Sequence, residues 1–134
     1  MRQTSDFIAY ADEHGYPVYR FPIPCSGSMV VDAGNGPSIA MDNSGTMTHC
    51  EEQAHAGHEC GHCETGTFYT RTSPCAVVEQ QECRADRWYI KHAIPKRKLF
   101  QLLRKGYTVE EIAEVFNTTE DYIMKAYYFY KEEA

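Results

Sequence analysis

The chain has 134 residues and a mass of 15.3 kDa, which suits one domain, residues 1–134, and is too short for two independent cores. Its 13 Lys and Arg against 19 Asp and Glu give a formal net charge of −6, which argues against a protein that coats nucleic acid or an anionic membrane. Hydrophobic residues make up 43% of the chain, a share that favours a folded domain over a disordered segment. Six Cys and six His are the unusual feature, because most of them fall in one stretch in the middle.

The sequence carries no apolar run that could span a bilayer and none that is typical of a secretory signal core. We therefore expect a cytoplasmic protein that makes no membrane contact and whose thiols are reduced. The six cysteines could instead form three disulfides in a secreted protein. This interpretation is less favoured because the sequence has no segment typical of a secretory signal.

The first 45 residues predict a helix followed by a small antiparallel sheet. Apolar residues within 3–14 recur at helical spacing. The segment 16–24 alternates like a strand, but its three prolines fit only the edge of a sheet. Two short apolar runs, 28–32 and 38–42, are joined by a turn that contains Asn-Gly, which is typical of a β-hairpin.

The remaining chain predicts helices alone. One helix covers 46–65, and a second covers 75–94 with an apolar side. Shorter helices follow at 96–105 and 109–116, and a final helix completes the chain. Two capping patterns mark helix starts, Thr108 with Glu111 and Thr118 with Asp121.

The helix expected at 46–65 contains the motif His58-Glu59-Cys60-Gly61-His62, or HExxH. Four residues are about one helical turn, so both imidazoles project from one face and can bind the same metal ion. Glu59 follows the first of them, where its carboxylate can reach a metal-bound water and act as a general base. The alternative is that the motif arises by chance on a solvent-exposed helix face. The small residues along this helix argue against it, because they permit close packing against another helix.

A third ligand is expected on the following helix. Glu82 and Glu79 are both candidates, and Glu82 is preferred because Asp86 lies one turn later and could support a ligand histidine. Three more residues are candidates for the site. Tyr69 and His92 are candidates for stabilising an oxyanion, and His55 either lines the cleft or lies on the surface.

These residues also carry a resemblance to a known family. HExxH followed by Glu82-Cys-Arg-Ala85-Asp86-Arg-Trp88 and then by Ile94-Pro95 resembles the ImmA/IrrE-type zinc metallopeptidases, which phages and mobile elements often encode. The resemblance implies an α+β zincin-like domain with a small antiparallel sheet (1–45), an HExxH helix and second ligand helix (46–94), and a C-terminal helical subdomain (95–134).

The resemblance further implies that His58, His62 and Glu82 bind Zn²⁺ and that Glu59 is the catalytic base. It implies a zinc-dependent endopeptidase whose substrate is a protein of the helix-turn-helix repressor type. A second hypothesis is a regulator that contains zinc and binds a protein partner without cutting it.

Two further interpretations are less favoured. Cys60 and Cys63 could join histidines in a closed structural zinc site, but their offsets direct them away from His58 and His62. The basic segment 91–105 is followed by a helix–turn–helix rhythm that would suit a DNA-binding protein, yet the second helix of the pair begins with acidic residues that phosphate would repel.

Overall fold

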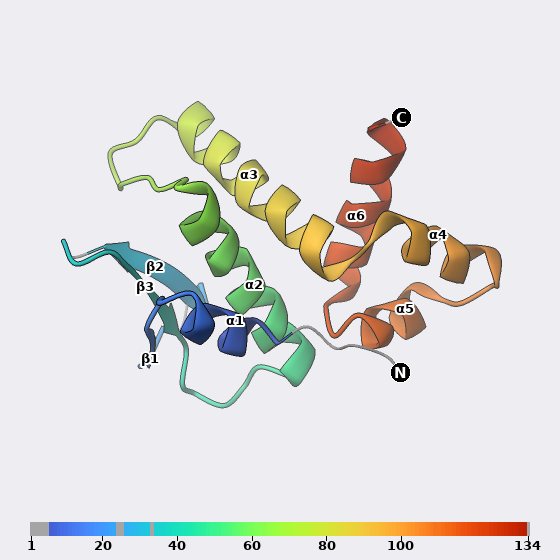
Figure 1. Ribbon diagram of the computed structural model, residues 1–134, viewed down its shortest axis with the longest axis horizontal. Helices are drawn as coiled ribbons and strands as arrows, with labels where there is room; N and C mark the ends of the chain where they lie inside the picture. Colours follow the sequence, from blue (N-terminus) through green and yellow to red (C-terminus); the bar gives the residue numbers. More distant parts are fainter. Residues whose placement is uncertain (1–5, 24–25, 33, 134) are drawn as a thin grey trace.

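The structure is a computed structural model that describes residues 6–23, 26–32 and 34–133. Residues 3–5 of the expected first helix, as well as Cys25, lie outside the described residues. Within them the fold is α+β, as predicted, with six helices and a three-stranded sheet (Figure 1). The elements in chain order are α1 (Phe7–Glu13), β1 (Val18–Arg20), β2 (Ser28–Asp32), β3 (Pro37–Met41), α2 (His49–Thr65), α3 (Cys75–Ala93), α4 (Lys96–Arg104), α5 (Val109–Val115) and α6 (Glu120–Glu132).

The sheet is mixed, not antiparallel as predicted, and has the order β1-β3-β2. The expected hairpin is confirmed, since β2 and β3 pair in antiparallel fashion with Val30 opposite Ile39. β1 is an edge strand, also as predicted, but it pairs with β3 in parallel, with Val18 opposite Ile39. The cause is the connection after β1, which carries the chain to the opposite edge, so that β3 enters between the other two strands.

Of the two predicted helix starts, the structure confirms that of α5 and corrects that of α6. Thr108 and Glu111 form the expected capping box at the start of α5. α6 begins one residue later than expected, because Thr119 and not Thr118 caps it by accepting the backbone N–H of Tyr122. Thr118 is buried instead, with its hydroxyl 2.7 Å from the hydroxyl of Tyr89. α2 likewise begins three residues later than expected, after a capping box of Thr48 and Glu51.

Glycines let α2 and α3 pack at very short range, as the adjacent green and yellow helices of Figure 1 indicate. A Cβ at Gly61 would lie 2.6 Å from the carbonyl oxygen of Ala85, and one at Gly57 would lie 2.2 Å from the ring of Tyr89. Larger residues would force the two helices apart. The HExxH motif is therefore held directly against the helix that carries Glu82.

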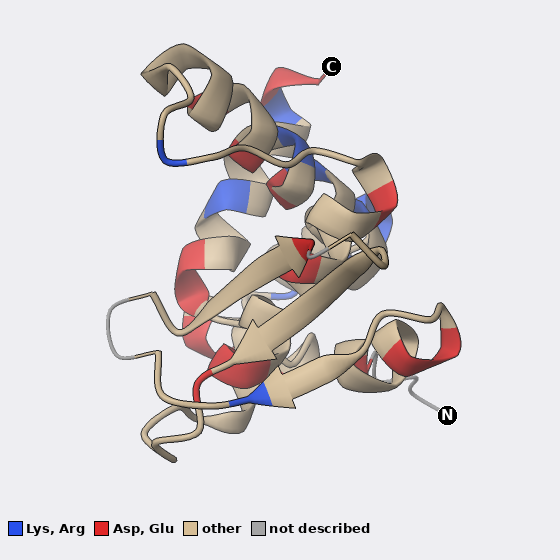
Figure 2. Cartoon of the chain, turned by 90° about the vertical axis from the view of Figure 1, so that its left-hand side faces the viewer, with Lys and Arg blue, Asp and Glu red and all other residues tan. Residues whose placement is uncertain are grey.

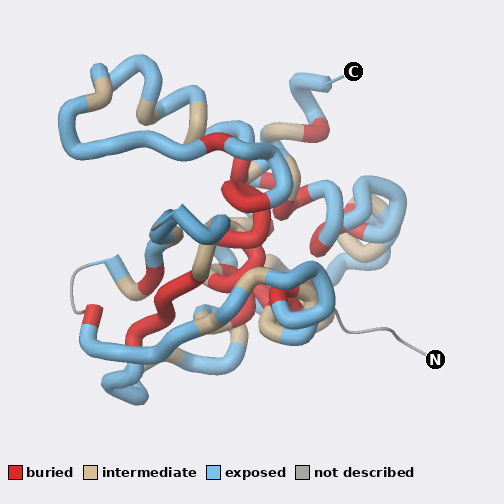
Figure 3. The backbone as a smooth tube through the Cα atoms, turned by 60° about the vertical axis from the view of Figure 1, so that its left-hand side comes forward, coloured by how far each residue is buried: buried red, intermediate tan, exposed pale blue. Residues whose placement is uncertain are grey.

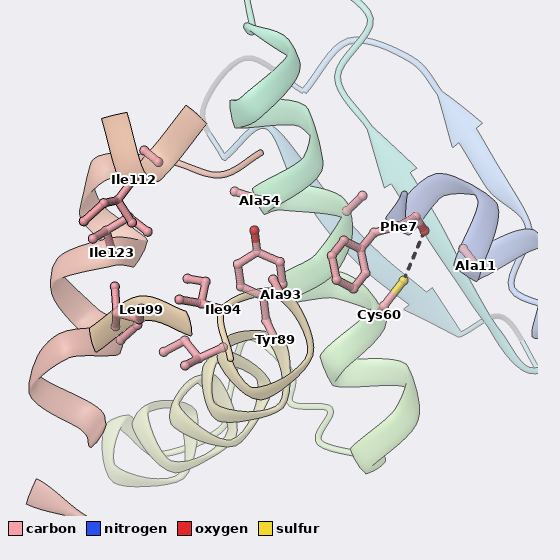
Figure 4. Packing of buried hydrophobic residues seen from close by; sticks show 14 of the residues in the cluster. Phe7, Ala11, Ala54, Cys60, Tyr89, Ala93, Ile94, Leu99, Ile112 and Ile123 are labelled. Atoms are coloured by element: carbon pink, nitrogen blue, oxygen red, sulfur yellow. Dashed lines mark hydrogen bonds between the residues drawn. The ribbon is translucent and has the colours of Figure 1, made fainter. Parts of the chain in front are cut away.

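A continuous buried cluster joins the two ends of the fold. Phe7 of α1 packs on Tyr89 with ring centroids 5.2 Å apart, and the cluster continues through Ile94 to Ile112 and Ile123 (Figure 4). Figure 3 shows the buried stretches running through the centre of the molecule, with exposed turns around them. This packing fixes the C-terminal helices against α3, and it brings Tyr122 of α6 within 3.2 Å of His58 on α2.

Charged residues are sparse on the sheet. Figure 2 shows the three strands almost free of Lys, Arg, Asp and Glu, apart from Arg20 and Asp32 at strand ends. Within the described ranges, no helix is both long enough and apolar enough to cross a membrane.

Candidate metal centre

The structure brings the three expected metal ligands together. His58 and His62 lie one turn apart on α2, with ring centroids 4.8 Å apart. Glu82 reaches them from α3, and one potential ligand atom from each of the three residues lies within 4.8 Å of the other two. Glu79 is exposed on the same helix and is not part of this group. Of the two carboxylates considered from the sequence, Glu82 is the one placed to bind a metal ion.

The outer nitrogen of each imidazole has an acceptor. Nδ1 of His58 lies 2.8 Å from Oδ1 of Asp86, and Nδ1 of His62 lies 2.6 Å from the backbone carbonyl oxygen of Thr67. Because a carboxylate and a carbonyl can only accept, each ring carries a proton on Nδ1. The Nε2 atoms are then left as the inward-facing positions, the arrangement that histidine ligands commonly adopt.

Both Nε2 atoms face the same carboxylate. The distance from His58 Nε2 to Glu82 Oε1 is 3.0 Å, and that from His62 Nε2 to Glu82 Oε2 is 2.7 Å. An imidazole lone pair and a carboxylate oxygen repel each other at this distance unless a positive charge is shared between them. A metal ion or a proton on the ring meets that need, so the donor set fits a divalent cation.

A proton on Nε2 of His58 can supply this positive charge. Burial alone would lower the pKa of His58, but hydrogen bonds to Asp86 and Glu82 outweigh burial and raise that pKa to about 10. Burial likewise opposes ionisation of Glu82, yet its contacts with His58, His62 and Tyr69 hold the pKa of this carboxyl below its usual range. Both shifts favour a cationic His58 ring beside an ionised Glu82 carboxylate.

Glu59 lies beside this group and outside it. Its side chain is buried, and its Oε2 accepts a hydrogen bond of 2.7 Å from the hydroxyl of Ser28 at the start of β2. His55, one turn earlier on α2, places Nδ1 2.8 Å from the same hydroxyl. His55 therefore lines the cleft, the first of the two positions considered for it. A carboxylate next to the ligands but not among them can exchange protons with a bound molecule.

The three candidate ligands and Glu59 line a groove of about 870 Å³. Its lining residues come from β2, α2, the segment 67–70, α3 and α6. Among the described residues β2 pairs with β3 alone, which makes it an edge strand. The groove is therefore lined both by the extended backbone of β2 and by the three candidate ligands.

Of the two oxyanion candidates, the structure places one at the groove. The hydroxyl of Tyr69 donates to Oε2 of Glu82 over 2.9 Å, and burial together with that carboxylate raises the pKa of Tyr69 to about 12. The phenol thus stays protonated and can donate a hydrogen bond. His92 lies elsewhere, stacked on Trp88 with ring centroids 4.0 Å apart.

Two residues of α6 complete the surroundings of Asp86, and the sequence did not reveal them. The hydroxyl of Tyr122 donates to Oδ1 of Asp86 over 2.6 Å, and Nζ of Lys125 lies 3.2 Å from Oδ2. Both belong to the helix considered for DNA recognition. Tyr122 and Lys125 are three residues apart and so share one face of the helix, which is the feature of the sequence that could have indicated a common contact.

The cysteines take no part in the candidate centre as far as the described residues show. Cys60 and Cys63 are buried and free, and Sγ of Cys60 lies 3.5 Å from the carbonyl oxygen of Phe7. Burial raises the pKa of each of these two thiols to about 12. Cys75 and Cys83 are free and exposed on α3. The structural Cys/His site therefore has no counterpart in the described part of the chain.

Comparison of the chain with protein-family models, with curated proteins and with solved structures finds no match in any of the three.

Proposed function

We propose that the protein is a zinc-dependent endopeptidase in which His58, His62 and Glu82 hold the metal and Glu59 is the general base. The observation that carries the proposal is the convergence of both Nε2 atoms on the Glu82 carboxylate, with Glu59 beside them and free of the group. Two His and one carboxylate are a known ligand set of catalytic zinc, which leaves the fourth position open.

A zinc ion bound there would supply a Lewis acid that polarises a substrate carbonyl and makes a water molecule more acidic. Glu59 would take one proton from the attacking water as its oxygen bonds to the carbonyl carbon. When the carbon–nitrogen bond breaks, the same carboxylate would pass that proton to the leaving amine. Tyr69 is a donor at the groove and would stabilise the negative charge on the former carbonyl oxygen.

The groove supports a peptide as the substrate class. An extended peptide can add to the free edge of β2 through backbone hydrogen bonds, which would lay its amide groups across the ligands. The resemblance of the HExxH motif and of the segment from Glu82 to Trp88 to the ImmA/IrrE-type metallopeptidases supports a zincin-like domain and suggests the substrate. We accordingly propose a repressor-type transcription regulator as the protein substrate.

Glu59→Gln tests the proposal, because the amide keeps the shape of the side chain but cannot take a proton. Co-expression with a panel of helix-turn-helix repressors, followed by mass spectrometry, should give fragments of at least one repressor with the wild type and only intact repressors with Glu59→Gln. The zinc content of the two proteins should be equal. Intact repressor with both, at full zinc content, would favour the second hypothesis, a regulator that binds its partner without cutting it.

A further inference from the structure

A hydroxyl from the sheet holds the proposed base. Ser28 and Glu59 are both 6% exposed, and Oγ of Ser28 donates to Oε2 of Glu59 over 2.7 Å. The other carboxylate oxygen, Oε1, accepts no hydrogen bond from the described residues, while Glu59 lines the groove. One oxygen is thus fixed by the protein, and the other remains available to a molecule in the groove.

His55 determines which way the hydroxyl proton points. Its Nδ1 lies 2.8 Å from Oγ of Ser28, and a hydroxyl has only one proton to donate. Since the Glu59 carboxylate can only accept, Ser28 gives its proton to Glu59 and must receive one from Nδ1–H of His55. The opposite tautomer of His55 would draw the proton away from Glu59.

The backbone around Ser28 leaves room for this ring. Gly27 has a φ of +79°, and a Cβ there would lie 2.9 Å from Cε1 of His55. Both the backbone conformation and the space favour glycine at this position. The backbone of Gly27 also accepts the N–H of Asp42 over 2.9 Å, which fixes the start of β2.

We infer that Ser28 and His55 are positioning residues for the base: together they fix the Glu59 carboxylate so that Oε1 faces the groove. This inference rests on the proposed function. Without the hydroxyl, the carboxylate of Glu59 can rotate away from the attacking water or turn toward the open coordination position. Either movement removes the base from the place where the proton must be taken.

Kinetics on a peptide probe test the role. The probe is the internally quenched decapeptide that the zinc-loaded wild type cleaves fastest in a mixed library. Ser28→Ala should lower kcat about 10- to 100-fold, as loss of a supporting hydrogen bond does at metal sites, with KM within about threefold of the wild type. Ser28→Thr keeps a hydroxyl and should restore kcat. His55→Asn, whose amide nitrogen can replace Nδ1, should be more active than His55→Leu.

A second measurement needs neither turnover nor zinc. Proton–nitrogen correlation spectra of the imidazole groups should show His55 protonated on Nδ1 in the wild type and in Ser28→Thr, and no longer held in that tautomer in Ser28→Ala. Circular dichroism would verify that all variants fold.

The outcomes separate the two proposals. A wild type that takes up zinc but cleaves no peptide and no repressor overturns the proposed function, and with it the role of Ser28. An active wild type with an equally active, folded Ser28→Ala variant overturns this inference alone. His55 protonated only on Nε2 in the wild type overturns it as well.

Discussion

Oδ1 of Asp86 lies 2.8 Å from Nδ1 of His58, and the carboxylate that makes this contact sits one turn after Glu82 on the same helix. A single face of α3 therefore supplies a candidate ligand and the group that orients another ligand. Tyr122 of α6 donates to the same oxygen of Asp86, and Lys125 lies beside the other oxygen. The C-terminal helix thus contacts the candidate metal centre through Asp86 and through the Tyr122 hydroxyl, which lies 3.2 Å from Nδ1 of His58.

Removal of this carboxylate should weaken metal binding. Asp86→Ala removes the charged acceptor of His58 Nδ1 and leaves only the Tyr122 hydroxyl, 3.2 Å away, so we expect a zinc dissociation constant about 10- to 100-fold higher than that of the wild type. Competition with a chelating dye measures it. Glu79→Ala is the matched control, because Glu79 is exposed on the same helix and should leave the affinity unchanged. Equal affinities for all three proteins would contradict the assigned role of Asp86.

Gly61→Ala should separate the ligand helices. The new Cβ would lie 2.6 Å from the carbonyl oxygen of Ala85, so α2 and α3 must move apart. We expect a loss of about 1–3 kcal/mol in the free energy of unfolding, typical of overpacking, and weaker zinc binding as Glu82 retreats from the histidines. Urea denaturation measures the first effect. Cys83→Ala, an exposed change on α3, serves as the control, and a Gly61→Ala variant as stable as this control would refute the close packing.

Thiol labelling should distinguish the buried and exposed cysteines. With pKa values of about 12, only about one in ten thousand of the Cys60 and Cys63 thiols is a thiolate at pH 8, and both are buried. Iodoacetamide at that pH should label Cys75 and Cys83 within minutes and the buried pair only after denaturation. Peptide mapping by mass spectrometry identifies the sites. Fast labelling of Cys60 in the native protein would contradict the packing against α1.

Acid should release the loop before α2. The Ser44 hydroxyl and the backbone N–H of Ile23 both donate to Asp42, and they lower the pKa of its carboxyl in the folded state. The unfolded chain binds the proton more readily, so the stabilisation is complete above the unfolded pKa of about 3.9 and is lost as the pH falls toward the folded value.

Asp42→Asn should therefore narrow the difference between the melting temperatures at pH 7 and pH 3. Asp12→Asn, an exposed change on α1, should leave that difference as it is in the wild type. The same acid dependence in wild type and Asp42→Asn would show that Asp42 does not fix this loop.

The sequence predicts what local chemistry determines. The capping box of Thr108 and Glu111, the hairpin and the HExxH spacing each depend on residues within a few positions of one another, and the structure contains all three. The pairing of Glu82 with the histidines was predictable because helical spacing also placed Asp86 where it could support them.

The contacts that escaped prediction join distant segments. Whether β1 runs parallel or antiparallel to β3 depends on the route of the connection after β1, which carries no clear local pattern. Ser28 meets Glu59 only because the sheet packs on α2, and Tyr122 meets Asp86 only because α6 folds back on α3. Such contacts depend on tertiary packing, which a single sequence does not specify by spacing.

The most direct test of the metal centre is the zinc content of the wild type, Glu59→Gln and Glu82→Gln, measured together by plasma mass spectrometry after zinc loading and gel filtration. We predict about one zinc per chain in the wild type and in Glu59→Gln, because three ligands hold one ion and Glu59 is not among them. Glu82→Gln should lose most of its zinc. A wild type without zinc, or a Glu59→Gln variant as depleted as Glu82→Gln, would contradict the account.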